Sequence, residues 1–238
     1  MKNLIKKTIK IILSPFIFLD YLKFTKFKDK RFTVKFSDFY PQIKDKTIKT
    51  NFDTHYVYHT SWAARKVKEI NPKVHTDISS SLYFSGIVSA FIPINFYDYR
   101  PADLKLSGLT NRSADLTKLD FGNDSINSLS CMHTVEHVGL GRYGDKFDPN
   151  GDLNAIKELK RVLAKNGSLL FVVPVGQPKI EFNAHRIYSY EQISEYFKDL
   201  TLREFSLITD KGDFIENAKM ELVKEQKYGC GCFWFIKQ

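Results

Sequence analysis

The chain has 238 residues and carries 36 Lys and Arg against 27 Asp and Glu, a formal charge of +9. Hydrophobic residues make up 43% and aromatic residues 14%, which is enough apolar material for a buried core and excludes wholesale disorder. Residues 1–31 hold nine basic and two acidic residues, so this segment is +7 and residues 32–238 are only +2. The basic character therefore belongs to the N-terminal segment.

The ratio of Lys to Arg and the number of cysteines indicate which partner and which compartment are expected. Lysine outnumbers arginine 28 to 8, whereas nucleic-acid surfaces favour arginine for bidentate contacts, so nucleic acid is not an expected partner. Cys131, Cys230 and Cys232 are an odd number without a disulfide framework. They indicate a reducing compartment, and we expect a cytoplasmic protein.

The first residues have the pattern of an amphipathic helix. Apolar residues recur at helical spacing over 4–16, with Lys2, Lys6, Lys7 and Lys10 on the other side. The apolar run over 11–19 is shorter than the about 20 residues that cross a bilayer, and no small-residue cleavage site follows it. Two interpretations stay open. The helix packs on the domain with a solvated lysine face, or residues 1–30 bind an anionic membrane surface on the inner face of the membrane.

Residues 32–55 are predicted to be a connecting segment, and regular elements alternate over 56–238. The pattern predicts helices over 56–70, 81–91, 152–164 and 190–197. It predicts strands over 73–78, 94–99, 126–132, 168–175, 202–208 and 232–236. This alternation is typical of a doubly wound α/β fold with a mostly parallel sheet, and the last two strands suit an antiparallel edge.

Ligands of doubly wound sheets bind outside the carboxyl ends of the strands. Acidic or small polar residues stand at these places in the sequence. They are Asp77 with the turn Ser79-Ser80-Ser81, then Asp98, then Asp115 with Leu116, and finally the run His133-Thr134-Val135-Glu136-His137. We expect these residues to surround one ligand site.

Four stretches, VHTDISSS, INFYDYR, SADLTKLDFGNDSINSLSCMHTVEHVG and LNAIKELKRVLAKNGSLLFVVPVG, carry a family resemblance. In this order they resemble the class I S-adenosylmethionine-dependent methyltransferases. EHVGLGRYGDKFDPNGD and YGCGCFWFIK are more narrowly similar to a methyltransferase-like family of unknown function in nematodes and bacteria, often beside surface-polysaccharide genes. The resemblance covers about residues 52–238. It implies a Rossmann-like, mostly parallel sheet of seven strands and S-adenosylmethionine as the cofactor.

The resemblance also implies roles for single residues in binding that cofactor. Asp77, Ser79 and Ser81 would face its methionine part, and Asp98 would accept hydrogen bonds from the ribose hydroxyls. Asp115 would accept a hydrogen bond from the adenine amino group, and Leu116 would donate its backbone amide. His133 would lie beside the transferable methyl group.

The turn Ser79-Ser80-Ser81 departs from the family pattern, in which glycines let the backbone approach the cofactor without a Cβ. Serine is small and can donate a hydrogen bond, so binding remains the expectation. The alternative is a non-catalytic methyltransferase-like module with weak or lost cofactor binding, because a shared fold does not fix function.

The run from His133 to His137 has the spacing of a possible metal site. His133, Glu136 and His137 share one helical face, and His185 lies downstream in a place comparable to a histidine of the metal-dependent small-RNA methyltransferases, which this segment resembles. Three imidazoles and a carboxylate would favour Zn²⁺ or another transition metal over Mg²⁺. The simpler interpretation is a polar lining without metal. A metalloprotease is excluded by the setting, because a strand precedes the run and glycines follow it.

Without a metal, His137 is the candidate general base, with Glu136 orienting it. A structural hydrogen bond is the plainer alternative for His137. The Gly-rich loop over 139–152 lies where a methyl acceptor would bind. Arg142, Tyr143 and Arg186 are the candidate acceptor-binding residues, since Arg pairs with phosphate or carboxylate groups. The resemblance to the family found beside surface-polysaccharide genes implies O-methylation of a saccharide, such as a nucleotide-sugar or lipid-linked glycan, in surface-polysaccharide assembly.

Overall fold

The computed structural model describes residues 15–27 and 31–238, and the chain divides into two units, 1–52 and 53–238. In the first unit, helix α2 (Pro15–Phe24) is followed by a short 3-10 helix, η1 (Phe36–Asp38). Phe18, Tyr21, Phe36 and Phe39 form an aromatic cluster in this unit, with ring centroids 5.2–6.3 Å apart. The amphipathic helix predicted over 4–16 lies outside the described residues except for Pro15 and Phe16.

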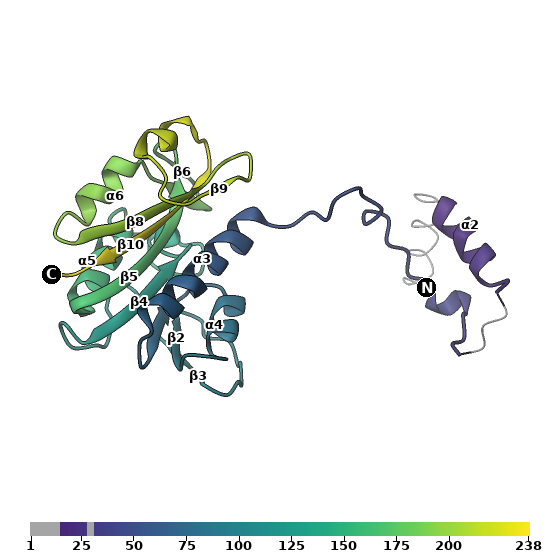
Figure 1. The fold of residues 1–238 in the computed structure, drawn as a ribbon, viewed down its shortest axis with the longest axis horizontal. Helices are drawn as coiled ribbons and strands as arrows, with labels where there is room; N and C mark the ends of the chain where they lie inside the picture. The colour runs from purple at the N-terminus through teal and green to yellow at the C-terminus, as the bar shows by residue number, and fades with distance from the viewer. Residues whose placement is uncertain (1–14, 28–30) are drawn as a thin grey trace. The chain divides into compact units, whose positions relative to one another are not determined.

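The second unit is built on one central sheet (Figure 1). Its strands are β1 (His75–Ile78), β2 (Ile94–Asp98), β3 (Leu109–Ser113), β4 (Ile126–Met132), β5 (Leu163–Val175), β8 (Thr201–Ile208), β9 (Phe214–Ile215) and β10 (Gly229–Ile236). They lie in the order β3-β2-β1-β4-β5-β10-β8-β9. The strands β3, β2, β1, β4 and β5, neighbours in this order, are parallel to one another, and β10 is antiparallel to both of its neighbours.

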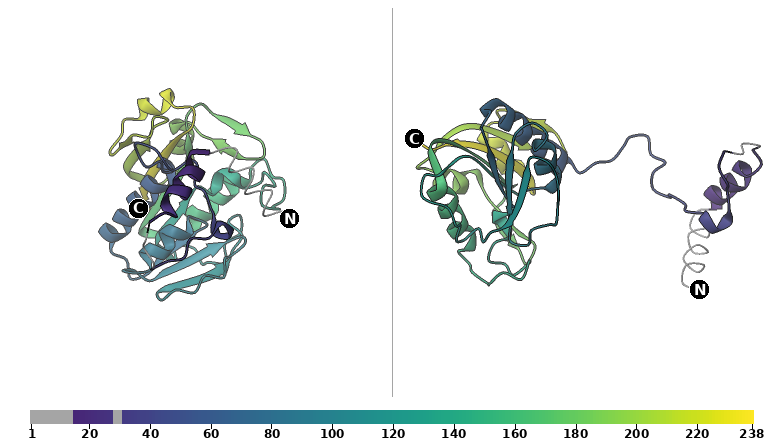
Figure 2. Two further views of the ribbon diagram at one scale, coloured as in Figure 1. Left: turned by 90° about the vertical axis from the view of Figure 1, so that its right-hand side faces the viewer. Right: turned by 90° about the horizontal axis from the view of Figure 1, so that it is seen from below.

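Helices cover both faces of the sheet, as Figures 1 and 2 show. On one face, α3 (Thr54–Ile70) and α4 (Leu82–Val88) bury Trp62, Val67 and Phe84. On the other, α5 (Gly151–Val162) and α6 (Tyr190–Tyr196) close a second core in which the rings of Phe171 and Phe197 lie 4.8 Å apart. The predicted α/β fold class is confirmed, with eight strands in the sheet of residues 53–238 in place of seven.

The prediction that the strands over 202–208 and 232–236 form the edge of the sheet is wrong for both, because β9 lies at the edge beyond β8. Of the two, β10 lies farther from that edge. This strand lies between β5 and β8, and seven of its eight residues are buried. Phe233 and Phe235 belong to one core, whereas Cys230, Cys232 and Trp234 belong to the other. A strand that is apolar on both faces belongs inside a sheet. The two cysteines are therefore interior residues and not the head of an edge strand.

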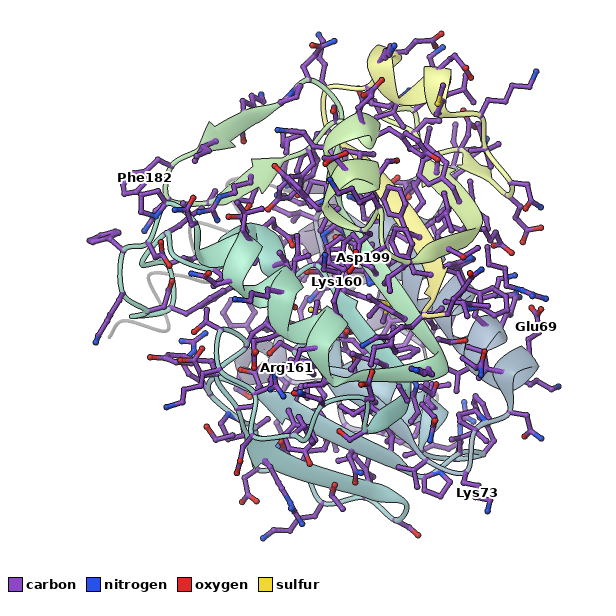
Figure 3. The ribbon with its side chains drawn as sticks, turned by 90° about the vertical axis from the view of Figure 1, so that its left-hand side faces the viewer. Glu69, Lys73, Lys160, Arg161, Phe182 and Asp199 are labelled. Carbon is purple, nitrogen blue, oxygen red and sulfur yellow. The ribbon has the colours of Figure 1, made fainter. Side chains whose placement is uncertain are left out.

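Four smaller elements complete the second unit. Strands β6 (Lys179–Glu181) and β7 (His185–Ile187) form a separate hairpin after β5, and Phe182 lies at its exposed tip (Figure 3). The 3-10 helices are η2 (Val135–His137) directly after β4 and η3 (Met220–Glu225) before β10. None of the helices in the described parts of the chain is long and apolar enough to span a bilayer.

Side chains on the outer face of α5 fix two loops (Figure 3). Lys160 donates to the Asp199 carboxylate at 2.9 Å and thereby ties α5 to the segment after α6. Arg161 donates to the backbone carbonyls of Leu119 and Phe121 at 2.9 and 2.7 Å. Glu158 accepts from the Leu119 amide at 2.8 Å. These bonds hold the segment after β3, which carries Asp115, against α5.

Candidate active site

A cleft of about 810 Å³ opens at the carboxyl ends of β1, β2, β3 and β4. The chain runs from β1 outward to β3 and then returns to β4 on the other side of β1, so the cleft lies at the point where the strand order reverses. Five of the predicted cofactor-binding residues line this cleft: Ser79, Asp98, Asp115, Leu116 and His133. Its volume is in the range of about 300–1,000 Å³ that is typical of small-molecule and cofactor pockets.

Ser79 begins the turn that forms the floor of the cleft. Its φ of 58° lies in the left-handed region, which costs about 1–2 kcal/mol for a residue with a side chain. Its amide donates to the Tyr97 carbonyl at 2.7 Å, and its own carbonyl accepts from the Thr134 hydroxyl at 2.7 Å. The turn thus has a backbone shape that favours glycine, held without a glycine by bonds to β2 and to the segment after β4. Ser81 precedes α4 as its N-cap residue and is not among the residues that line the cleft.

Asp77 lies below the cleft, outside its lining. It is fully buried, and its two carboxylate oxygens accept from the hydroxyls of Ser85 at 2.6 Å and Ser130 at 2.5 Å. Ser130 also contacts the buried ring of His75 at 2.9 Å. Burial raises the pKa of Asp77 to about 6. The observed contacts of Asp77 are therefore internal ones that join β1 to α4 and β4.

Asp98 is the last residue of β2, and Asp115 lies on the turn that follows β3. One Asp98 oxygen accepts from the Arg100 amide at 2.7 Å. One Asp115 oxygen accepts from the amide and the hydroxyl of Thr117, at 2.8 and 2.7 Å. Such Asx turns orient a carboxylate without burying it. Both carboxylates are thus held in fixed orientations at the lining of the cleft.

A second pocket of about 550 Å³ adjoins the cleft and shares His133, His137 and Tyr143 with it. Residues from well-separated parts of the chain line this pocket. Asp53, His55 and Tyr56 come from the start of α3, Glu136 from η2, Arg142 from the Gly-rich loop, Ala184 and His185 from the β6–β7 hairpin, and Tyr228 from the residue before β10. The cleft and the second pocket are therefore adjacent, and the rings of His133, His137 and Tyr143 form the wall between them.

His137 has a geometry that leaves one ring nitrogen free for chemistry. Its Nδ1 lies 2.6 Å from the Ala184 carbonyl, so the neutral ring carries its proton there and donates it. Arg142 donates to the same carbonyl at 2.9 Å. The Nε2 atom then holds the lone pair and lies 3.7 Å from the Glu136 carboxylate. Burial lowers the pKa of His137. A neutral imidazole with an available Nε2 is what a general base requires.

Glu136 is buried with one of its oxygens unsatisfied. Its Oε1 accepts from His133 Nδ1 at 2.9 Å, whereas Oε2 has no hydrogen-bond partner. Burial raises the pKa of Glu136 to about 7. A buried polar atom without a partner costs about 1–3 kcal/mol, and such atoms gather where a ligand completes the site. Clustered groups with displaced pKa values are typical of functional sites.

The candidate acceptor-binding residues separate into two kinds. Arg142 and Tyr143 line the second pocket, and the Arg142 guanidinium lies 5.2 Å from the Tyr143 ring centroid. Arg186 is buried, and it donates to the Val138 carbonyl at 2.7 Å while its guanidinium lies 3.6 Å from Asp152. The acceptor-binding prediction for Arg186 is therefore wrong. Its guanidinium N–H groups bind the backbone that leads into the Gly-rich loop, and Arg186 is not among the residues that line either pocket.

The predicted metal ligands His133, Glu136, His137 and His185 do not form one ligand group among the described residues. The group whose ligand atoms all lie within 4.8 Å of one another, searched over that same part of the chain, is His55, His133 and Cys230. Sequence reasoning missed His55 and Cys230 at this place, together with Tyr56 and Tyr228. They are far from the run 133–137 in sequence, and no spacing rule connects them.

Comparison with known proteins supports the fold that these observations indicate. Residues 108–221 match a family described as Caenorhabditis protein of unknown function, DUF268. A putative sarcosine dimethylglycine methyltransferase from Galdieria sulphuraria superposes with a TM-score of 0.54 at 12% identity, over 76% of this chain and 86% of that one. The chain has a class I methyltransferase fold. The predicted likeness to a methyltransferase-like family of unknown function is confirmed.

Two further structures show how widely this fold is used. The YcgJ protein from Bacillus subtilis gives a TM-score of 0.52 at 11% identity, over 76% of this chain and 99% of that one. The [4+2]-cyclase SpnF gives 0.52 at 11% identity, over 75% and 80%. No curated protein matches the sequence. At these identities the likeness concerns the fold alone, so the argument for function rests on the site.

Proposed function

We propose that this protein is an S-adenosylmethionine-dependent methyltransferase that methylates an oxygen atom of a saccharide. The observation that carries the proposal is the wall that the 810 Å³ cleft shares with the 550 Å³ pocket. A cofactor bound in the cleft and an acceptor bound in the pocket would lie on two sides of His133 and His137. A methyl transfer needs two such sites with a base between them.

The residues of the cleft fit the cofactor. Asp98 and Asp115 provide carboxylates for the ribose and adenine groups, and the Ser79 turn brings backbone to the floor of the cleft. Leu116 lies beside Asp115 in the lining of the cleft, where its backbone amide is available to the adenine ring. When bound, S-adenosylmethionine supplies a methyl group activated by a positively charged sulfur.

The residues of the second pocket would bind the methyl acceptor and remove its proton. His137 Nε2 takes the proton of the acceptor hydroxyl, and the Ala184 carbonyl keeps the ring in the tautomer that can do so. The resulting imidazolium lies 3.7 Å from the Glu136 carboxylate, which stabilises its charge. Arg142 offers a cation for a phosphate or carboxylate group on the acceptor. Nucleotide-sugars and lipid-linked glycans carry such phosphates.

The function is tested by following a labelled methyl group from S-adenosylmethionine into saccharide acceptors. Purified full-length protein is incubated with two pools, nucleotide-sugars and lipid-linked glycan precursors, and label is measured in each after separation. We expect label in one of these pools and none in control reactions with RNA or with a general protein substrate. Label in RNA or protein alone would contradict the saccharide assignment.

A non-catalytic module is the second candidate, and the serine turn is the observation that favours it. Ser79 occupies a left-handed position that favours glycine, and its Cβ stands where the family brings backbone close to the cofactor. Such a module would bind a saccharide in the 550 Å³ pocket and would not bind S-adenosylmethionine. Cofactor binding therefore separates the two candidates.

We also propose that the N-terminal unit holds the protein on the inner face of the membrane. None of the residues of α2 is buried, and its Phe16 and Phe24 are 77% and 60% exposed. Residues 1–31 carry +7, and each Lys or Arg near an anionic surface contributes about 1 kcal/mol of binding. Apolar side chains and basic charge together favour interfacial binding.

Deletion of residues 1–30 is expected to release the protein from anionic vesicles. Co-sedimentation with vesicles of phosphatidylserine and phosphatidylcholine measures the bound fraction, and vesicles of phosphatidylcholine alone are the control. The full chain should bind the anionic vesicles and lose that binding in high salt. Equal binding by the shortened protein would argue against the proposal.

A further inference from the structure

We propose that His55, His133 and Cys230 form a binding site for one Zn²⁺ ion, open toward the 550 Å³ pocket. The three side chains come from the start of α3, the end of β4 and the start of β10, and their ligand atoms all lie within 4.8 Å of one another. His133 Nε2 and Cys230 Sγ are already 3.3 Å apart, close to the spacing of two ligands of a tetrahedral ion.

The second nitrogen of His133 has the partner that a metal-bound histidine usually has. Its Nδ1 donates to the buried Glu136 carboxylate at 2.9 Å, which leaves Nε2 as the unprotonated nitrogen facing Cys230. Histidine ligands of zinc almost always donate their other N–H to a carboxylate, carbonyl or water, which fixes the tautomer and raises the basicity of the ring. Glu136, His133 and the ion would form such a carboxylate–histidine–zinc triad.

Unsatisfied buried atoms around these ligands point to a missing bound group. Glu136 Oε2 and His59 Nε2 are buried without a hydrogen-bond partner. Glu136 contacts His133 through its other oxygen at 2.9 Å, and the His59 ring lies 4.9 Å from the His133 ring. Buried polar atoms without a partner are uncommon in folded proteins, and two of them lie beside the same candidate ligand. A metal ion with bound water would satisfy atoms of this kind.

The chemistry of the three ligands selects the ion. Two neutral imidazoles and a thiolate suit Zn²⁺, whereas Mg²⁺ and Ca²⁺ take oxygen ligands. Binding replaces the Cys230 thiol proton, which passes to solvent, and gives a site with a net charge of about +1. Three protein ligands leave a fourth position for water or a substrate oxygen, and His55 and His133 both line the 550 Å³ pocket.

Zinc binding does not require the proposed methyl transfer, so one of the two proposals can be wrong while the other is right. If the pocket takes the methyl acceptor, as the proposed function holds, the fourth position would receive the acceptor oxygen. The site differs from the one predicted over His133, Glu136, His137 and His185, because two of its three ligands lie on α3 and β10.

Metal analysis of the purified full chain tests the proposal. The protein is loaded with Zn²⁺ or with Co²⁺, freed of excess metal, and measured by elemental analysis and by absorption spectroscopy. We expect about one Zn²⁺ per chain, and a Co²⁺ spectrum with a thiolate charge-transfer band and tetrahedral d–d bands. Cys230→Ser should abolish the charge-transfer band, and His55→Ala should weaken metal binding by about tenfold or more.

Cys232→Ser is the matched control, because Cys232 is equally buried, faces the same core from β10 and is outside the ligand group. It should keep the metal content and the charge-transfer band, and circular dichroism checks that all four variants, including Glu136→Gln, fold. Glu136→Gln should lower zinc affinity by about 10- to 100-fold without changing the stoichiometry. The proposal is overturned if the full chain binds no Zn²⁺, or if Cys230→Ser and His55→Ala bind it as the unmodified protein does.

Discussion

Replacement of His137 by Gln is expected to lower kcat for methyl transfer by about 10²–10⁴-fold, the usual contribution of a general base. The Ala184 carbonyl accepts from Nδ1 of the His137 ring at 2.6 Å, which leaves Nε2 free. The side-chain amide of glutamine is not basic and cannot take the acceptor proton in its place. The KM for S-adenosylmethionine should change little, because the substitution leaves Asp98 and Asp115, the proposed cofactor-binding residues, unchanged. The labelled-methyl assay measures both constants.

His185→Gln is the control for this experiment. His185 lines the same pocket, its ring centroid lies 6.4 Å from that of His137, and its Nε2 faces Glu181 at 3.4 Å. We expect its kcat to fall by less than about tenfold, or about 1.4 kcal/mol. A His137→Gln enzyme that keeps its rate within tenfold of the unmodified enzyme would remove His137 from the mechanism.

The pH profile gives an independent readout of His137. Burial lowers its pKa from the ordinary value of 6.5, and a base works in its neutral form. Activity should therefore be at its plateau at neutral pH and fall only as the pH drops below 6.5 through the lowered pKa. The residual activity of His137→Gln should lack this acid limb. An acid limb that is the same in both enzymes would assign the titration to another group.

Replacement of Asp98 by Ala is expected to weaken S-adenosylmethionine binding by roughly 100-fold, or about 3 kcal/mol, since two charge-assisted hydrogen bonds to the ribose would be lost. The Asp98 carboxylate is fixed at the cleft by the Arg100 amide at 2.7 Å, so its ordering adds little cost to binding. Isothermal titration calorimetry measures the dissociation constant.

Asp103→Ala controls for a general loss of negative charge near the cleft. Asp103 lies in the same loop after β2, is exposed, and faces Lys105 at 3.7 Å, outside the lining of the cleft. We expect the affinity of this variant to equal that of the unmodified protein. Equal affinities for Asp98→Ala and the unmodified protein would mean that the ribose is held elsewhere.

Strands with a buried apolar pattern could be predicted from the sequence, and polar ones could not. The strand over Ile126–Met132 is found with the predicted bounds, because six of its seven residues are buried. In contrast, β3 has the sequence LTNRS and lies at the edge of the sheet with no buried residue, so its sequence has no strand pattern. The position of β10 depends on which strands it pairs with, and apolar composition alone does not reveal pairing.

The same limit applies to the site. Asp98 ends a strand and Asp115 and His133 follow strands, so the rule that ligands bind at the carboxyl ends of strands is enough to find them. The contact between Cys230 and His133 joins residues 97 positions apart and exists only because β10 inserts beside β5. The charge of Arg186 suits an anionic acceptor, but its donors bind the backbone carbonyls of Val138 and Asp148, before and within the Gly-rich loop.

Titration of S-adenosylmethionine into the unmodified full-length protein tests the central claim most directly. The cleft at the carboxyl ends of β1 to β4 predicts saturable binding of about one cofactor per chain, in the micromolar range expected for such sites. Competition by S-adenosylhomocysteine should abolish the signal. The absence of any binding heat, confirmed by equilibrium dialysis with labelled cofactor, would contradict the methyltransferase function and leave the saccharide-binding module in its place.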